Sequence, residues 1–313
     1  MPNYKIGLIV LTRDRQGMLD EMLDSIRMQS YREYSCIVLD NGSSDATVAN
    51  VRTRSEQDSR FEVRTWCACS AEKNFQRAID IGSTDFDWFA MLHDDDRLDV
   101  DWLKRAMEGV LAHPRCAMVN VNALTFASDT GEMGRIWYHD FSGQQIFLPD
   151  QSALARWMIR YGSLHFPSTL YRGEILLGWT LTNPYGKCSD QYFLMELARN
   201  GGVYVVGDPL YHYRIHTGQD STTMDESLIL SLQAYIDFHL SWKFHPVVMI
   251  ERNRNLLKLF RHFRAVKDDF SPEILARFLW KWKIILIDAK EIMRLMRALR
   301  AWIGRSRTNL SKR

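Results

Sequence analysis

The chain has 313 residues, enough for one large domain with an appendage or for two domains, and its 46% hydrophobic and 25% charged residues exclude a disordered or fibrous protein. Its five cysteines are irregularly spaced, no secretory leader opens the sequence and no uncharged apolar run reaches the length of a bilayer span, so we expect a reducing, cytoplasmic location. The net charge of +2 conceals a basic end, because residues 251–313 hold 17 Lys/Arg against 6 Asp/Glu, which suggests a negatively charged surface as partner.

Apolar runs alternate with amphipathic segments over residues 4–121. Strands are expected at 5–11, 35–39, 61–66, 88–92 and 117–121. Helices are expected at 18–29, 46–55, 71–81 and 101–112, the third ended by Gly82. This alternation is typical of βαβ units, so the sequence predicts an α/β fold with a mostly parallel central sheet flanked by helices.

The alternation stops after residue 122. Residues 128–143 are rich in Gly, Asp and Tyr and are expected to form a long loop over the end of the sheet, of the kind that often acts as a lid. Later elements are expected as a helix at 151–160, a strand at 168–171, a helix at 189–199 and a strand at 202–207. From residue 227 the pattern is helical and basic. Lys290, Arg294 and Arg297 share one face of an amphipathic helix, a pattern that fits a membrane interface or packing on the body or a second subunit.

Three carboxylates, Asp94, Asp95 and Asp96, directly follow the apolar run at 88–92. Open α/β sheets bind ligands at the carboxyl ends of their strands, where Asp40 also lies. Adjacent carboxylates repel one another, and Mg²⁺ or Mn²⁺ bound to them would relieve the repulsion. A solvated acidic turn is the alternative. The first strand is followed by neither G-x-G-x-x-G nor a Walker A sequence, which argues against a Rossmann or P-loop nucleotide site.

Several motifs, in order, resemble family 2 inverting glycosyltransferases. They are Thr12-Arg13-Asp14-Arg15, the run Val-Leu-Asp-Asn-Gly-Ser-Ser-Asp-Ala-Thr at 38–47, Asn74 followed by the acidic triplet, Ser189-Asp190 before a helix, and Tyr213-Arg214-Ile215-His216. The resemblance covers about residues 4–220. It implies a GT-A fold in which residues 1–225 form the transferase domain, with a nucleotide-sugar half at 1–122 and an acceptor half at 123–225. A helical, basic C-terminal region at 226–313 would follow.

The resemblance also implies roles for individual residues. Asp190 would be the catalytic base. The nucleotide would be bound by Thr12, Arg13, Arg15, Asp40, Asn41, Ser43, Lys73, Asn74, Asp94 and Asp95. Mn²⁺ or Mg²⁺ would be held by Asp96, Asp95 and His216. The sequence departs from the family at His93, which stands where the first Asp of the metal motif is most common, and at Lys73, which replaces an Arg.

The expected function is a metal-dependent inverting transferase that moves a sugar from a nucleoside-diphosphate sugar, expected to be a UDP-sugar, to a saccharide acceptor. The basic end suggests a lipid-linked acceptor, surface-polysaccharide synthesis (O-antigen or capsule) and a peripheral position on the cytoplasmic face of the inner membrane. The alternatives are an inactive sugar-nucleotide-binding or membrane scaffold protein and a sugar-nucleotide pyrophosphorylase. The latter would need a Gly-rich loop after the first strand, and residues 12–17 contain one Gly. No nucleic-acid motif is present, so no nucleic-acid partner is expected.

Overall fold

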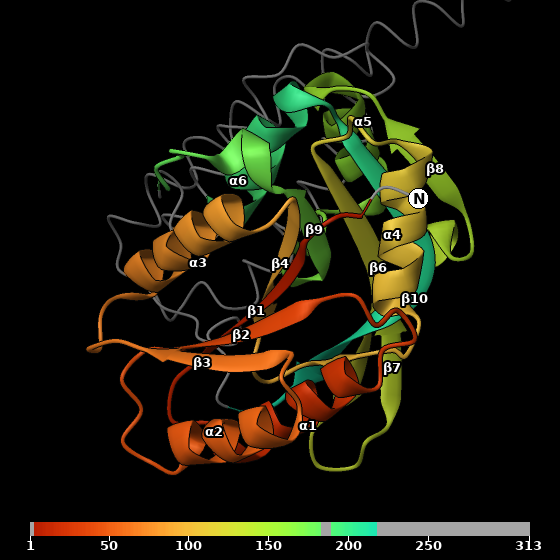
Figure 1. Cartoon of the computed structure of the whole chain (residues 1–313). Helices are drawn as coiled ribbons and strands as arrows, with labels where there is room; N and C mark the ends of the chain where they lie inside the picture. The colour runs from red at the N-terminus through yellow and green to blue at the C-terminus, as the bar shows by residue number, and fades with distance from the viewer. Residues whose placement is uncertain (1–2, 183–188, 218–313) are drawn as a thin grey trace, which may run out of the picture. The chain divides into compact units, whose positions relative to one another are not determined.

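The computed structural model describes residues 3–182 and 189–217 (Figure 1). The first part of the chain alternates strands and helices as expected: β1 (Ile6–Thr12), α1 (Gln16–Arg27), β2 (Ser35–Asp40), α2 (Thr47–Gln57), β3 (Phe61–Thr65), α3 (Ala71–Asp85), β4 (Trp88–His93), β5 (Arg97–Leu98) and α4 (Trp102–Ala112). The second part contains β6 (Met118–Ala127), β7 (Met133–Ile136), β8 (Gln145–Leu148), α5 (Gln151–Tyr161), β9 (Thr169–Arg172), α6 (Ser189–Leu197) and β10 (Val203–Ile215). Short 3-10 turns include η1 (His139–Phe141), η2 (Phe166–Ser168), η3 (Gly173–Leu176) and η5 (Ala198–Asn200).

The strands of the described residues form one sheet in the order β3-β2-β1-β4-β9-β6-β10-β5, with β7 beside β6 and β8 beside β10. The long ladders β3-β2-β1-β4 and β6-β10 are parallel, which confirms the predicted mostly parallel α/β sheet. The short strand β9 separates β4 from β6 and runs antiparallel to both. The carboxyl ends of β1, β2 and β4 consequently lie at one edge, which is where the candidate site forms.

Side chains of each strand alternate between two packed faces. Trp88, Ala90 and Leu92 of β4 belong to a buried cluster with the apolar faces of α1 and α4. Phe89 faces the other side, where it packs on Gly82 of α3 and beside Tyr171 of β9. Figure 1 shows α1 and α2 on one side of β1 to β3 and α3 on the other.

Two expectations about the secondary structure are wrong. Helix α3 does not end at Gly82 but continues to Asp85. Gly82 therefore lies inside the helix. A Cβ at this position would lie 2.2 Å from the ring of Phe89, so only glycine permits this close packing of the helix against the sheet. Residues 128–143 are not a structureless loop, because β7 pairs with β6, and Tyr138 is buried with its hydroxyl donating to Asn120 at 2.9 Å.

Strand β10 is longer than predicted. The sequence separates a strand at 202–207 from the motif that follows it, whereas the structure continues the strand to Ile215 with irregular register around Pro209. Proline lacks the amide hydrogen of a regular ladder, and a bulge accommodates it. As a result, the end of this one strand contacts the acidic triplet directly. The predicted basic helix at 226–313 lies outside the described residues.

Candidate functional site

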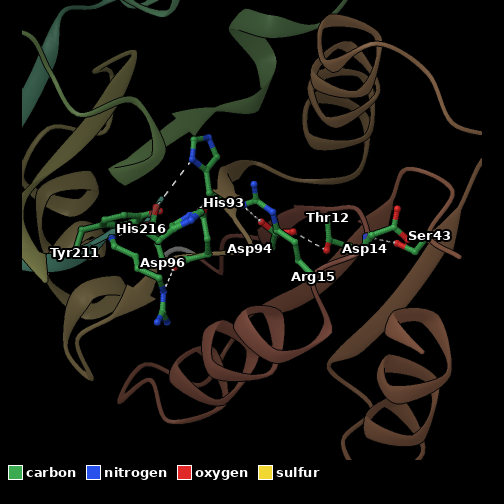
Figure 2. A network of polar contacts seen from close by, with 11 residues as sticks. Thr12, Asp14, Arg15, Ser43, His93, Asp94, Asp96, Tyr211 and His216 are labelled. Atoms are coloured by element: carbon green, nitrogen blue, oxygen red, sulfur yellow. Dashed lines mark hydrogen bonds and ion pairs between the residues drawn. The ribbon is translucent and has the colours of Figure 1, made fainter. Parts of the chain in front are cut away.

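The three carboxylates that follow β4 contact different partners, and Figure 2 shows this for Asp94 and Asp96. Asp94 faces β1 and accepts a hydrogen bond from the Thr12 hydroxyl at 2.7 Å. Asp95 lies between Arg15, whose Nη1 is 2.5 Å from Oδ2, and His216, whose Nε2 is 3.0 Å from the same oxygen. Asp96 is fully buried and faces β10. The chain thus spreads one short turn across three separate environments.

The electrostatics of this turn call for a cation. Burial raises the pKa of Asp94 to about 6 and that of Asp96 well above its ordinary value. Burial also acts to raise the pKa of Asp95, but His93, His216 and Arg15 together hold it below the ordinary value. Donor atoms of His93, Asp95 and Asp96 lie within 4.8 Å of one another. Burial favours the protonated forms of these clustered carboxylates. A divalent ion bound among them would favour their charged forms instead.

Strand β10 holds the turn in place. The Tyr211 hydroxyl donates to Asp96 at 2.7 Å, and the Arg214 amide donates to its other oxygen at 2.8 Å. The Arg214 side chain is buried, donates through Nε to the Asp95 carbonyl at 2.5 Å and pairs with Glu21 of α1. Arg97 pairs with the same Glu21 carboxylate. The charged groups on α1, β5 and β10 therefore fix the backbone of the acidic turn.

The arginines are also held by an aromatic ring. The guanidinium carbons of Arg97 and Arg214 lie 4.7 and 4.6 Å from the centroid of the Phe126 ring. Cations over an aromatic face are attracted to it, the more so when partly desolvated. Phe126 of β6 thus helps to hold the two arginines that share Glu21.

The predicted nucleotide-binding residues converge on the ends of β1 and β2. Asp40 is fully buried and its carboxylate accepts the Ser43 amide at 3.1 Å, the hydrogen bonding of a turn-forming aspartate. Ser43 Oγ accepts the Asp14 amide at 2.9 Å, which joins the two loops. Arg13 is half exposed beside Asp14. The binding of a base by Asp40 stays a prediction.

Asn41 connects this edge to α3. Its amide oxygen accepts the Cys69 backbone amide at 2.9 Å and its amide nitrogen donates to the Cys69 carbonyl at 3.0 Å. Lys73 and Asn74 follow in the first turn of α3, whose N-cap is Ser70. Asn74 is buried and its side-chain oxygen has no hydrogen-bond partner in the protein. A buried polar atom without a partner is energetically unfavourable. A helix N-terminus beside a lysine attracts anions.

Asp190 lies in the first turn of α6. Both its oxygens accept from Gln191, one from the backbone amide at 2.8 Å and one from the side chain at 2.9 Å. Burial nevertheless raises its pKa to about 6. Gln191 also donates to the Leu164 carbonyl at 3.2 Å, which ties this helix start to the segment before η2. A carboxylate with this pKa accepts protons effectively near neutral pH.

Sequence reasoning missed several residues of the site. Glu21 and Tyr211 hold the acidic turn, and His93 joins the donor group. His165 is buried beside Tyr211, with ring centroids 4.9 Å apart, and burial lowers its pKa to about 3, so it is neutral. The signal for His93 was its position in β4. Residues of a strand alternate between its two faces, so His93 lies on the same face as Phe89 and away from the main core. Glu21 and His165 carried no comparable signal.

The model of the family described as Glycosyl transferase family 2 matches residues 8–173, more than half of the chain. The chain belongs to this family. A relative from Haemophilus influenzae described as an uncharacterized glycosyltransferase is 22% identical over 222 residues, which cover 69% of this chain and 67% of the relative. The family membership makes the chain a glycosyltransferase and confirms the resemblance drawn from its motifs.

Solved structures of other glycosyltransferases share the fold of this family 2 chain. The S. aureus TarS fragment 1–349 in complex with UDP-GlcNAc has a TM-score of 0.64 at 17% identity, and the match covers 91% of this chain and 81% of that fragment. The mannosyltransferase PcManGT from Pyrobaculum calidifontis, in complex with GDP-Man and Mn²⁺, has a TM-score of 0.55 at 15% identity, with 90% and 81% covered. These similarities confirm the predicted GT-A fold. Among the described residues, no helix has the length and apolar character needed to cross a membrane.

Proposed function

We propose that the chain is a metal-dependent inverting glycosyltransferase that uses a nucleoside-diphosphate sugar, with UDP as the nucleotide. The observation that carries this proposal is the turn of Asp94, Asp95 and Asp96, which β1, the loop before α1 and β10 all contact. TarS and PcManGT share the fold. TarS binds UDP-GlcNAc, and PcManGT binds GDP-Man and Mn²⁺, which supports a nucleotide-sugar donor here. Thr12, Arg15 and Asp94 would face the nucleotide.

Asp95 and Asp96 would hold Mn²⁺ or Mg²⁺, with His216 beside Asp95. The ion would supply positive charge for the diphosphate leaving group. Lys73 and the start of α3 would add positive charge for the phosphates. Arg15 pairs with both Asp94 and Asp95. Any shift of these carboxylates when they bind the donor and the ion would therefore also shift Arg15.

Asp190 would act as the base. Its carboxylate would remove the proton of an acceptor hydroxyl as that oxygen bonds to the anomeric carbon, and the bond from this carbon to the diphosphate oxygen would break on the opposite face. One direct displacement inverts the anomeric configuration. Product analysis by NMR tests this step, because retention of the donor's configuration would exclude Asp190 acting in a single displacement.

Calorimetry with UDP-, GDP- and dTDP-sugars, each with Mn²⁺ and with EDTA, tests the donor and the ion. We expect UDP-sugar binding that EDTA abolishes and that Asp95→Ala weakens at least about tenfold. Asp129→Ala, a change in an exposed turn, is the matched control. Binding of no nucleotide in the presence of Mn²⁺ would refute the proposal.

The acceptor is proposed to be a lipid-linked saccharide of surface-polysaccharide synthesis, approached from the cytoplasmic face of the membrane. The proposal rests on the composition of residues 226–313, in which helical spacing predicts that Lys290, Arg294 and Arg297 share one face. Replacing all three by Glu should abolish sedimentation with anionic vesicles and leave UDP-sugar binding unchanged. Equal sedimentation of both proteins would exclude this helix as the membrane contact.

A further inference from the structure

His93 is placed as a metal ligand would be. Its Nδ1 lies 4.0 Å from Asp96 Oδ2, and Figure 2 shows the ring directed at this carboxylate. This separation is too long for a hydrogen bond. Two ligands bound to one octahedral ion at about 2.1 Å each are separated by roughly 3.0 Å when adjacent and 4.2 Å when opposite. At 4.0 Å the observed gap lies between these two values and near the second, which leaves room for one ion between the two donor atoms.

The fold explains why His93 points toward this position and Asp94 does not. His93 is the last residue of β4 and pairs in register with Leu11 of β1. Its ring packs against the edge of Phe75 on α3, with centroids 6.2 Å apart, on the face of the sheet opposite the main core. Asp94 follows it and turns the other way, to Thr12. Strand alternation thus gives the ion an imidazole where the linear order of the triplet would have suggested a third carboxylate.

We propose that His93 is a nitrogen ligand of the divalent ion, together with Asp95 and Asp96, and that it makes the site prefer Mn²⁺ to Mg²⁺. The inference rests on the proposed function, which requires an ion at this turn, and adds the identity of a ligand and the preferred metal. Mg²⁺ favours oxygen ligands, whereas imidazole suits the later transition metals and Mn²⁺ accepts both. His216 contacts Asp95 Oδ2, which is the position of a residue that orients a ligand or joins it.

Pulsed EPR of Mn²⁺ bound to the full-length protein tests the ligand directly, because a bound imidazole nitrogen produces ¹⁴N modulation. His216 also carries nitrogen, so the measurement is made with Mn²⁺ alone in the His216→Ala variant. We expect ¹⁴N modulation there and its loss in the double variant His93→Ala/His216→Ala. Mn²⁺ bound to His216→Ala without ¹⁴N modulation would overturn the inference while leaving the proposed function intact. Failure of every form to bind Mn²⁺, with or without UDP, would instead overturn the proposed function.

Metal competition tests the preference. His93→Asp replaces nitrogen by oxygen and retains a ligand, so its own Mg²⁺ binding shows that the site is folded. We expect the ratio of the Mg²⁺ to the Mn²⁺ dissociation constant to fall at least about tenfold relative to wild type. His139→Asp changes a histidine whose side chain is 81% exposed and should leave the ratio unchanged. An unchanged ratio in His93→Asp would contradict direct ligation by His93.

Discussion

Replacing Asp190 by asparagine should make the protein more stable near neutral pH and nearly inactive. Burial raises the pKa of Asp190 from 3.8 to about 6, and this rise corresponds to about 3 kcal/mol between the two protonation states. Because the folded pKa exceeds the unfolded one, the stabilising contribution is fully present below about pH 4 and is lost as pH rises through about 6. The neutral amide does not ionise. Asp190→Asn should therefore raise the free energy of unfolding near neutral pH by up to about 3 kcal/mol.

Urea denaturation from about pH 4 to neutral pH measures the difference, which should close at the acidic end. The same carboxylate acting as base predicts that kcat/KM falls about tenfold per pH unit below about 6, and that the variant loses roughly 10²- to 10⁴-fold in rate. Glu196→Gln, a change further along α6, is the control and should leave the pH profile unchanged. A variant as active as wild type, or wild-type activity constant down to about pH 5, would refute the assignment of the base.

The other predictions concern the acidic turn and the packing beneath it. Asp95→Ala should abolish Mn²⁺ binding measured by EPR titration while the circular dichroism spectrum stays that of the wild type, and bound Mn²⁺ would exclude Asp95 as a ligand. Glu21→Gln weakens the pairing of buried Arg214 and should lower the free energy of unfolding by about 1.5–3 kcal/mol in urea titrations, so an unchanged midpoint would count against the clamp. Gly82→Ala should destabilise the protein by about 1–3 kcal/mol, since the added Cβ would clash with the Phe89 ring. An added Cβ at Gly17 meets nothing within 4 Å, so Gly17→Ala should be neutral or stabilising. Thermal melts of the two variants test the difference.

Much of the structure of residues 4–121 could be predicted because its signals are local. The apolar runs of β1, β2 and β4 and the amphipathic spacing of α1 and α4 follow directly from burial on one or both faces. The acidic turn was predicted at the end of a buried strand, and it lies there. Gly82 misled the prediction because its packing against Phe89 is a tertiary contact, which overrides helix propensity.

The elements after residue 122 and the supports of the site were harder to predict because they depend on partners distant in sequence. The insertion of β9 between β4 and β6 follows from pairing that the linear pattern does not encode. Tyr138 orders part of the expected loop by a hydrogen bond to Asn120, and Glu21 acquires its role only when β10 brings Arg214 beside it. Single residues of these types have no distinctive pattern, so only the folded chain distinguishes them.

The long reach of β10 has a consequence for how the protein becomes functional during synthesis. Arg214 binds Asp96 across 118 residues and Glu21 across 193 residues of chain. A nascent chain that has released only residues 1–122 would have the acidic turn but not the strand that fixes its direction. Contacts between segments so distant in sequence form slowly, because the chain entropy of the intervening loop must be lost first. The acidic turn would therefore acquire its final geometry late, after the ribosome has made β10.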